Sequence, residues 1–268
     1  MESAWPITIF GLLFVAMFAL ESWMDRDGAA RPQGKRRFTN IILFFLGSGV
    51  MAVLPISVFV AAIWGRAQGW GAMSLLGVPS GLNFVIGFVA VSLGGYVFHR
   101  LTHHIPFLWR FHQVHHSDDF LDVTTTLRHH PVELAFGAAF MSILVVILGV
   151  TAAAYAAHVI FAACVGIIQH SRITWSPHVE RWVRLGIMTP KLHHIHHSTY
   201  VRETDSNYSI DLAIWDHVFG TFQGAPLRPP HQFAYGLNQC PQPLCDDLDH
   251  QLVVPFMKQK KDAPKGTP

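Results

Sequence analysis

Long runs of apolar residues follow one another through the first two thirds of the chain. Residues 5–24 form a run about as long as a helix needs to cross the ~30 Å hydrocarbon core of a bilayer, and the N-terminus lacks the basic start of a cleaved signal peptide. Two further runs cover residues 38–65, with Pro55 as a kink, and roughly residues 82–98. We expect each run to be a membrane helix.

A fourth apolar region, within residues 132–170, is too long for one crossing. Gly149 and Thr151 interrupt it near its middle. We therefore expect a helical hairpin whose two arms enter and leave the membrane, or a re-entrant pair that does not fully cross. Together the runs predict an all-α, polytopic membrane helical bundle with about four to five membrane helices.

Composition supports a membrane protein. Hydrophobic residues make up 51% of the chain and charged residues 13%, and the mean hydropathy is positive, which does not match a soluble protein of this length. The near-neutral net charge gives no reason to expect nucleic acid as a partner. Cys164, Cys240 and Cys245 lack C-x-x-C spacing, so we expect neither a disulfide framework nor a cysteine-rich zinc site.

Loop charge predicts the orientation of the bundle. The loop after the first run is basic, whereas residues 65–80 carry only Arg66. The positive-inside rule places that basic loop in the cytoplasm. Counting spans onward puts residues 99–131 and everything after His170 on the same side, so we expect the histidine clusters and the C-terminus to be cytoplasmic. The basic residues are Arg26, Arg31, Lys35, Arg36 and Arg37.

Three short segments concentrate histidines at helical spacing. His99 and His103 are four residues apart in "HRLTHH", and the arrangement H-x-x-H-H occurs in both "FHQVHH" and "HHIHH". Residues three and four apart are neighbours on one helix face, so each segment offers several imidazoles to one place. The candidate metal ligands in these clusters are His99, His103, His112, His115, His116, His193, His196 and His197.

The number of histidines favours two metal ions. One tetrahedral zinc takes four ligands, whereas these eight, with His170 at the end of the hairpin as a ninth, can complete two coordination spheres. Imidazole suits iron, copper, nickel and zinc, and zinc can displace ferrous iron during purification. The chain has no H-E-x-x-H motif and few acidic residues inside the clusters, which disfavours a zinc peptidase and a carboxylate-bridged iron pair.

The series "HRLTH", "FHQVHHS", "TPKLHHIHHS" and "DSNYSIDLAIWDHVFGTF" resembles the fatty acid hydroxylase and sterol desaturase superfamily, over about residues 94–223. The resemblance implies a centre of two iron ions held by the nine histidines, with molecular oxygen as co-substrate. It further implies hydroxylation or desaturation of a C–H bond in a lipid or sterol-like substrate, of which hydroxylation is the simpler outcome. Doubled histidines at 103/104, 129/130 and 193/194 leave the choice of ligand within each pair open by one residue.

Other polar residues have weaker roles in this interpretation. Asp205, Asn207 and Asp216 either accept hydrogen bonds from the ligating rings or only build a turn and a short helix. His130 precedes Pro131, which favours a helix start over a ligand. His158 is expected to make a polar contact within the hairpin. His104, His129 and His194 are left as supporting donors or solvated side chains.

The chain has no dinucleotide-binding fingerprint and no haem-domain motif, so the electrons must come from a separate protein of the ferredoxin, cytochrome b5 or reductase type. The substrate is expected to enter from the bilayer. Two other classes remain: a divalent-metal transporter, disfavoured because the spans are nearly bare of charge, and a metal-stabilised membrane scaffold. We divide the chain into N-terminal membrane helices (1–98), a histidine-rich domain that contains the hairpin (99–223), and a C-terminal cover with a disordered tail (224–268).

Overall fold

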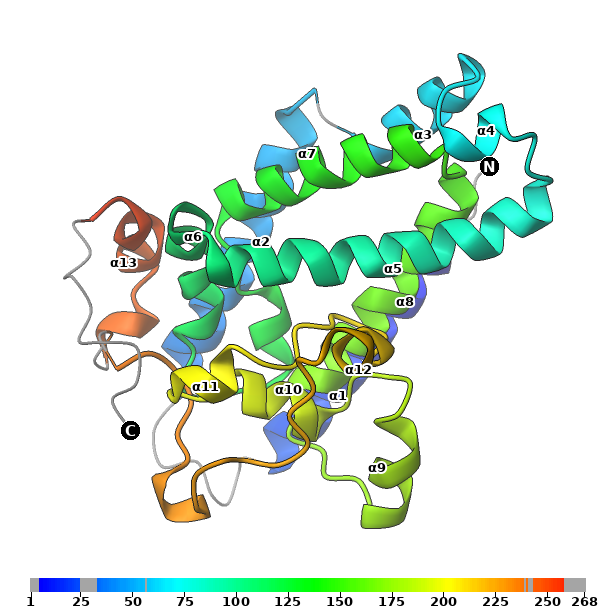
Figure 1. Ribbon diagram of the computed structural model, residues 1–268. Coiled ribbons are helices and arrows are strands. Elements are labelled where there is room, and N and C mark those ends of the chain that lie inside the picture. Colours follow the sequence, from blue (N-terminus) through cyan, green and yellow to red (C-terminus); the bar gives the residue numbers. More distant parts are fainter. Residues whose placement is uncertain (1–4, 25–32, 56, 239, 241–242, 258–268) are drawn as a thin grey trace.

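The computed structural model describes residues 5–24, 33–55, 57–238, 240 and 243–257 (Figure 1). Arg26, Arg31 and the predicted disordered tail at residues 258–268 lie outside the described residues. The long helices are α1 (Trp5–Met24), α2 (Gly34–Val53), α3 (Val58–Ala67), α5 (Ser80–His104), α6 (Pro106–His116), α7 (Pro131–Leu148) and α8 (Ala152–His170).

Short helices make up the rest of the ordered chain. They are α4 (Ala72–Leu75), α9 (Pro177–Val183), α10 (Pro190–His196), α11 (Val201–Thr204), α12 (Ile214–Phe219), α13 (Leu248–Val253), and the 3-10 helices η2 (Val123–Leu127), η3 (Pro230–Gln232), η4 (Leu244–Asp246) and η5 (Val254–Phe256). Extended pairing in the described part of the chain is limited to one bridge between Ser198 and Tyr235. The expected all-α class is therefore confirmed.

Four helical stretches are long and apolar enough to cross a membrane: Gly34–Leu75, Ser80–His104, Pro131–Leu148 and Ala152–His170. The first expected span is helical over Trp5–Met24, and its part Phe10–Met24 is an apolar helix shorter than the four stretches above. Its crossing stays a prediction. The chain is a multi-pass membrane protein, in which α5 packs against both α7 and α8 (Figure 1).

The hairpin turns where the sequence indicates. Gly149 ends α7 with a φ of 71°, a left-handed conformation that glycine adopts without steric cost. The hydroxyl of Thr151 then caps α8 by accepting a hydrogen bond from the Ala154 amide at 3.2 Å. Asn83 of α5 clamps this turn, because its amide nitrogen donates to the Gly149 carbonyl and its oxygen accepts from the Thr151 amide.

Two prolines separate helices as expected. Pro55 lies in the break between α2 and α3, and Pro106 begins α6 directly after α5 has ended at His104. The second break matters for function because it turns the chain sharply. The histidines of α6 can then lie beside those at the end of α5.

A buried network of charges joins α2 to the loop between α6 and α7. The Arg36 guanidinium binds both Asp118, at 2.8 Å, and Asp122. The guanidinium of Arg128 donates to the Asn40 side chain at 2.7 Å and to backbone and hydroxyl acceptors around it. Burial opposes the charged form of Asp118, but Arg36 and Arg128 together hold its pKa below the ordinary value. The network therefore stays ionised and fixes the loop that follows the second histidine cluster.

Residues 243–257 cover this loop. Gln251 is fully buried and donates to the Cys245 carbonyl at 2.8 Å, and the Thr39 hydroxyl donates to the carbonyl of Asp246. The structure pairs Cys240 with Cys245 in a single disulfide, whereas the cysteine spacing gave no reason to expect a disulfide framework. Their separation of five residues brings the two sulfur atoms together across one loop, a possibility that C-x-x-C spacing does not cover.

Candidate metal centre

The histidine rings gather where the end of α5 meets α6, α8 and α10. They form two buried groups, in each of which one nitrogen per ring lies within 4.8 Å of the others. All nine histidines singled out from the sequence belong to one group or the other. The five-histidine group consists of His99, His103, His112, His116 and His196, and the four-histidine group of His115, His170, His193 and His197.

Each H-x-x-H-H triplet contributes to both groups. In α6 the pair four residues apart, His112 and His116, joins the five-histidine group, and His115 joins the other. At the end of α10 the assignment is reversed. The pair four residues apart, His193 and His197, belongs to the four-histidine group, and His196 belongs to the five-histidine group. The groups adjoin, with the rings of His116 and His197 stacked at 4.5 Å. The repeat of the triplet therefore builds two neighbouring sites from two helices.

Backbone carbonyls fix the tautomers of rings in the five-histidine group. The Nδ1 of His99 donates to the Tyr208 carbonyl at 2.6 Å, and the Nδ1 of His196 donates to the Ser206 carbonyl at 2.7 Å. A neutral imidazole has a single N–H, so a ring whose Nδ1 donates presents a lone pair at Nε2. The carbonyls thereby leave Nε2 of both rings as an acceptor.

The same arrangement holds in the four-histidine group. The Nδ1 of His170 donates to the Gly166 carbonyl at 2.7 Å, and the Nδ1 of His115 donates to the Arg128 carbonyl at 3.2 Å. The Nε2 atoms of these two rings lie 3.2 Å apart and carry lone pairs that face each other. Such a pair repels unless a cation lies between the nitrogens.

The five-histidine group shows this repulsive arrangement twice over. The Nε2 of His99 lies 3.0 Å from Nε2 of His112 and 3.1 Å from Nε2 of His196. The Nδ1 of His112 donates to Glu133, so all three facing nitrogens carry lone pairs. Both ring nitrogens of buried His103 lack a hydrogen-bond partner. These side chains fit a bound metal ion, because a cation accepts all the lone pairs at once.

Electrostatics keeps these imidazoles neutral. Burial first, and then the neighbouring rings, lower the pKa of four histidines outside the spans well below the ordinary value, and burial lowers the pKa of His196 to about 3. Neutral imidazole is the form that binds metal. These four are His115, His116, His193 and His197.

The nitrogen spacing within each group matches ligands that share one ion. For metal–nitrogen bonds of about 2.1 Å, ligands at right angles lie about 3.0 Å apart and ligands at the tetrahedral angle about 3.4 Å apart. The facing Nε2 atoms lie 2.9 Å apart for His170 and His193, and 3.0 to 3.2 Å apart in the pairs above. The spacing is short enough for neighbouring rings of one group to bind the same ion.

The three polar residues named as possible supports lie in different places. The carboxylate of Asp205 lies 3.5 Å from Nδ1 of His103. Asn207 instead binds backbone groups of Leu192 and Gln223, and Asp216 accepts from the amides of Tyr208 and Ser209. Asn207 and Asp216 thus shape the turn whose carbonyls hold His99 and His196, and reach the rings only through the backbone.

Sequence reasoning missed Glu133. Its Oε1 accepts hydrogen bonds from Nδ1 of His112 and of His129, at 2.7 and 3.2 Å, and the His129 ring stacks on His115 at 4.4 Å. The signal was present, because Glu133 follows His129 by four residues at the start of a helix. The sequence could not show that Glu133, at the start of α7, points at His112 in α6.

His130 and His158, outside the two groups, have structural partners. His130 caps α7, with Nδ1 accepting from the Val132 amide at 3.1 Å, which confirms the expected helix start. His158 was expected to make its contact within the hairpin, but Nε2 instead binds the Asp211 carboxylate at 2.5 Å. The loop that carries Asp211 packs between α5 and α8, an arrangement that no local pattern reveals.

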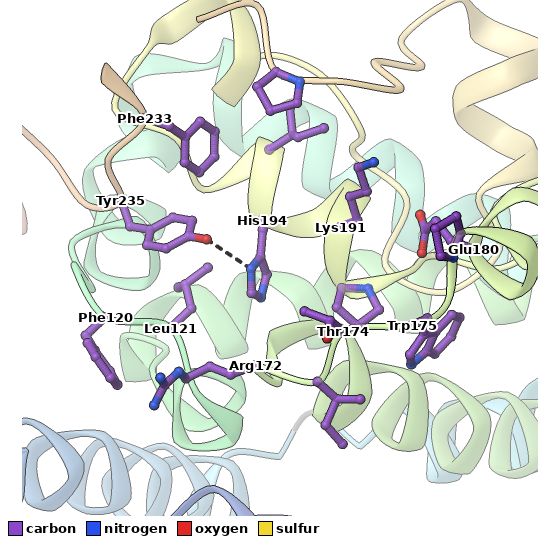
Figure 2. A pocket seen from close by; sticks show the side chains of 15 residues that line it. Phe120, Leu121, Arg172, Thr174, Trp175, Glu180, Lys191, His194, Phe233 and Tyr235 are labelled. Carbon is purple, nitrogen blue, oxygen red and sulfur yellow. Dashed lines mark hydrogen bonds between the residues drawn. The ribbon is translucent and has the colours of Figure 1, made fainter. Parts of the chain in front are cut away.

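A cavity of about 570 Å³ lies beside α10 (Figure 2). His194 projects into it and binds the Tyr235 hydroxyl at 3.1 Å through Nδ1. Most of the lining is apolar, with Arg172 and Lys191 among the polar residues. Because His193 and His194 are adjacent on α10 and only His193 belongs to a metal-binding group, the cavity and the metal centre use different faces of this helix.

Comparison with known proteins identifies relatives. An ornithine lipid hydroxylase, OlsE, of Rhizobium tropici is 34% identical over 151 residues, which are 56% of this chain and 44% of that protein. The alkylglycerol monooxygenase of Homo sapiens is 28% identical over 234 residues, 84% of this chain and 49% of that protein. The Xenopus tropicalis alkylglycerol monooxygenase is 29% identical over 250 residues, 92% of this chain and 53% of that protein.

The chain spans about half the length of these curated relatives. No solved structure gave a significant match. The family model for fatty acid hydroxylases matches residues 84–221, just over half of the chain, and this range runs from within α5 to the end of α12 and contains both groups of histidines. The chain therefore belongs to the fatty acid hydroxylase family.

Proposed function

We propose that the protein is an integral-membrane oxygenase that uses O2 and an external electron donor to hydroxylate a C–H bond of a lipid. The observation that carries this proposal is the set of facing Nε2 lone pairs, fixed by carbonyls and by Glu133, which requires cations. Membership of the family and relatives named as a hydroxylase and a monooxygenase support the reaction class.

The five-histidine and four-histidine groups would each hold one iron ion. Two such ions supply activation of O2 when bound, so that one oxygen atom enters the C–H bond and the other leaves as water, with two electrons and two protons from outside. The chain's own residues hold the imidazoles neutral and oriented. Burial of both groups keeps water away from the reacting bond.

The electrons must come from a separate donor, because the chain has no dinucleotide or haem motif. A protein of the ferredoxin, cytochrome b5 or reductase type would serve. The lipid substrate would reach the centre from the bilayer, because the ligands on α5 and α8 lie at the ends of membrane-spanning helices. The basic residues between α1 and the first turn of α2 support a cytoplasmic position for the centre, and a reporter fused after Pro268 should then be cytoplasmic.

The test is lipid mass spectrometry under 18O2. Cells that express the protein should contain lipids heavier by one 18O atom, and cells that express His196→Ala at equal abundance should not. A lipid that loses two hydrogens and gains no oxygen would instead make the enzyme a desaturase. Identical lipid profiles in expressing and empty cells, with both metal ions present in the purified protein, would contradict the proposal.

A further inference from the structure

The short helix α12 lies beside the middle of the membrane-spanning helix α5 (Figure 1). The Trp215 indole donates to the Ser92 hydroxyl at 2.9 Å, and the ring of Phe219 stacks on Tyr96 at 5.1 Å. A Cβ atom at Gly95 would lie 2.5 Å from the Ile210 side chain, so the segment before α12 touches the α5 backbone closely. The chain from Ile210 to Phe219 therefore runs along α5.

These contacts place α12 nearer the middle of the membrane than the metal centre. Ser92 is at the midpoint of α5 (Ser80–His104), seven residues before His99. At 1.5 Å per residue, it lies about 10 Å from His99 along the helix axis, toward the membrane interior. A helix that packs against Ser92 and Tyr96 is therefore at the depth of the acyl chains, although with six residues it is too short to cross.

Polar groups of this segment are satisfied inside the protein, as hydrocarbon surroundings require. The Asp211 carboxylate is fully buried and accepts from Ser92 of α5 at 2.6 Å, while its other oxygen binds His158 of α8. Asp216 is also fully buried and accepts from the amides of Tyr208 and Ser209. Both carboxylates thus face the bundle, not its outer surface.

The outer face of α12 is mainly apolar, and His217 is its one exposed polar residue. Ile214, Val218 and Phe219 are 46%, 62% and 45% exposed. A surface helix in water has the opposite pattern, with charged residues outside and apolar residues inside. Nearby α9 exposes Trp182 beside Arg181, whose guanidinium lies 5.3 Å from the indole. Tryptophan with arginine is typical of the boundary between lipid and water.

We infer that α12 is inserted into the leaflet on the side of the metal centre, and that Ile214, Val218 and Phe219 contact lipid acyl chains. The occupant is lipid because Val85, which is 58% exposed, lies about two helical turns before Ser92 on the same face of α5, so α12 packs in line with the apolar surface of a membrane-spanning helix. The inserted helix covers the part of α5 that lies between the hairpin turn, at Asn83, and the metal centre, at His99. This conclusion rests on the contacts of α12 and does not depend on the proposed reaction.

Photo-crosslinking in vesicles tests the inference. The photoreactive amino acid p-benzoylphenylalanine replaces Val218 in the full chain, which is reconstituted in phosphatidylcholine vesicles and irradiated. Val85 on α5 is the lipid-facing reference, and exposed Arg202 on α11 is the water-facing reference. We expect mass spectrometry to find phosphatidylcholine adducts at Val218 at a yield within about twofold of Val85, and none at Arg202.

Two outcomes would overturn the inference: a Val218 yield as low as that of Arg202, or a product of twice the chain mass, which would assign the face to a second copy. The Ile214 position serves as a repeat, so that a variant that does not fold is replaced. Metal content equal to that of the unmodified protein shows that each labelled chain has kept its fold.

Discussion

The Oε1 atom of Glu133 lies 2.7 Å from Nδ1 of His112 and directs Nε2 of that ring into the five-histidine group. Replacement of Glu133 by alanine should let the ring rotate and take the other tautomer. We expect metal affinity to fall about 10- to 100-fold, the usual cost of losing a partner behind a metal-binding histidine. Competition with a chromophoric chelator measures this affinity.

Two further variants separate orientation from charge. Glu133→Gln keeps an acceptor for His112 and should lose less affinity than Glu133→Ala. Glu203→Gln is the matched control, because Glu203 is a buried glutamate that accepts from the Leu227 amide and makes no contact with the two groups. Equal affinity in Glu133→Ala and the unchanged protein would show that Glu133 does not position the ring.

How far the sequence predicts the site depends on whether the signal is local. The H-x-x-H-H triplets on α6 and α10 are local, because spacing alone places their rings together. Nothing local says that the two triplets divide oppositely between two groups, since that follows from the relative orientation of α6 and α10. The nine histidines could therefore be predicted from the sequence, but not their division between the two groups.

In the fold, too, the features with a local signal could be predicted and those without one could not. Gly149 and Pro106 mark a turn and a break by their own backbone preferences, so these boundaries could be predicted. Asn83 and Asp211 are single polar residues whose partners lie 66 and 119 residues away in sequence. Neither has a local pattern, and each becomes meaningful only when α5 lies beside the hairpin.

Replacement of either of two adjacent histidines at the end of α10 should remove a different ion. His196 belongs to the five-histidine group and His197 to the four-histidine group, so alanine at either position should lower the metal content from about two ions per chain to about one. His194→Ala is the control, because this ring binds Tyr235 and should leave both ions in place. Elemental analysis of purified protein gives the count. One ion per unchanged, active chain would contradict the pair of sites.

Arg128 should be essential for stability. Its guanidinium is fully buried and donates to the Val114 and Cys245 carbonyls, the Asn40 side chain and the Ser117 hydroxyl. Arg128→Met would leave these acceptors without this donor and remove one of the two positive charges near Asp118, and should lower the free energy of unfolding by about 3–5 kcal/mol. Denaturant unfolding in detergent measures the loss. Arg110→Met, at a half-exposed position, should cost less than about 0.5 kcal/mol.

The α7 cap should make stability depend on pH. The Nδ1 of His130 accepts from the Val132 amide while Nε2 donates to the Leu252 carbonyl at 3.3 Å, so the cap needs the neutral ring. Burial lowers the pKa of His130 below its ordinary value. As pH falls below about 6.5, the unfolded chain therefore takes up this proton before the folded chain does, and the folded state loses stability until the folded pKa is reached.

His130→Asn isolates this effect, because asparagine caps a helix equally well and does not titrate. Above about pH 7.5 we expect the wild type and the variant to differ in free energy of unfolding by less than about 1 kcal/mol. Between about pH 6.5 and 5 the wild type should lose stability relative to the variant, by up to 1.4 kcal/mol for each unit by which the folded pKa is lowered. Thermal unfolding in detergent across this range gives the difference directly. Parallel curves for the two proteins would mean that the neutral His130 ring does not hold the cap.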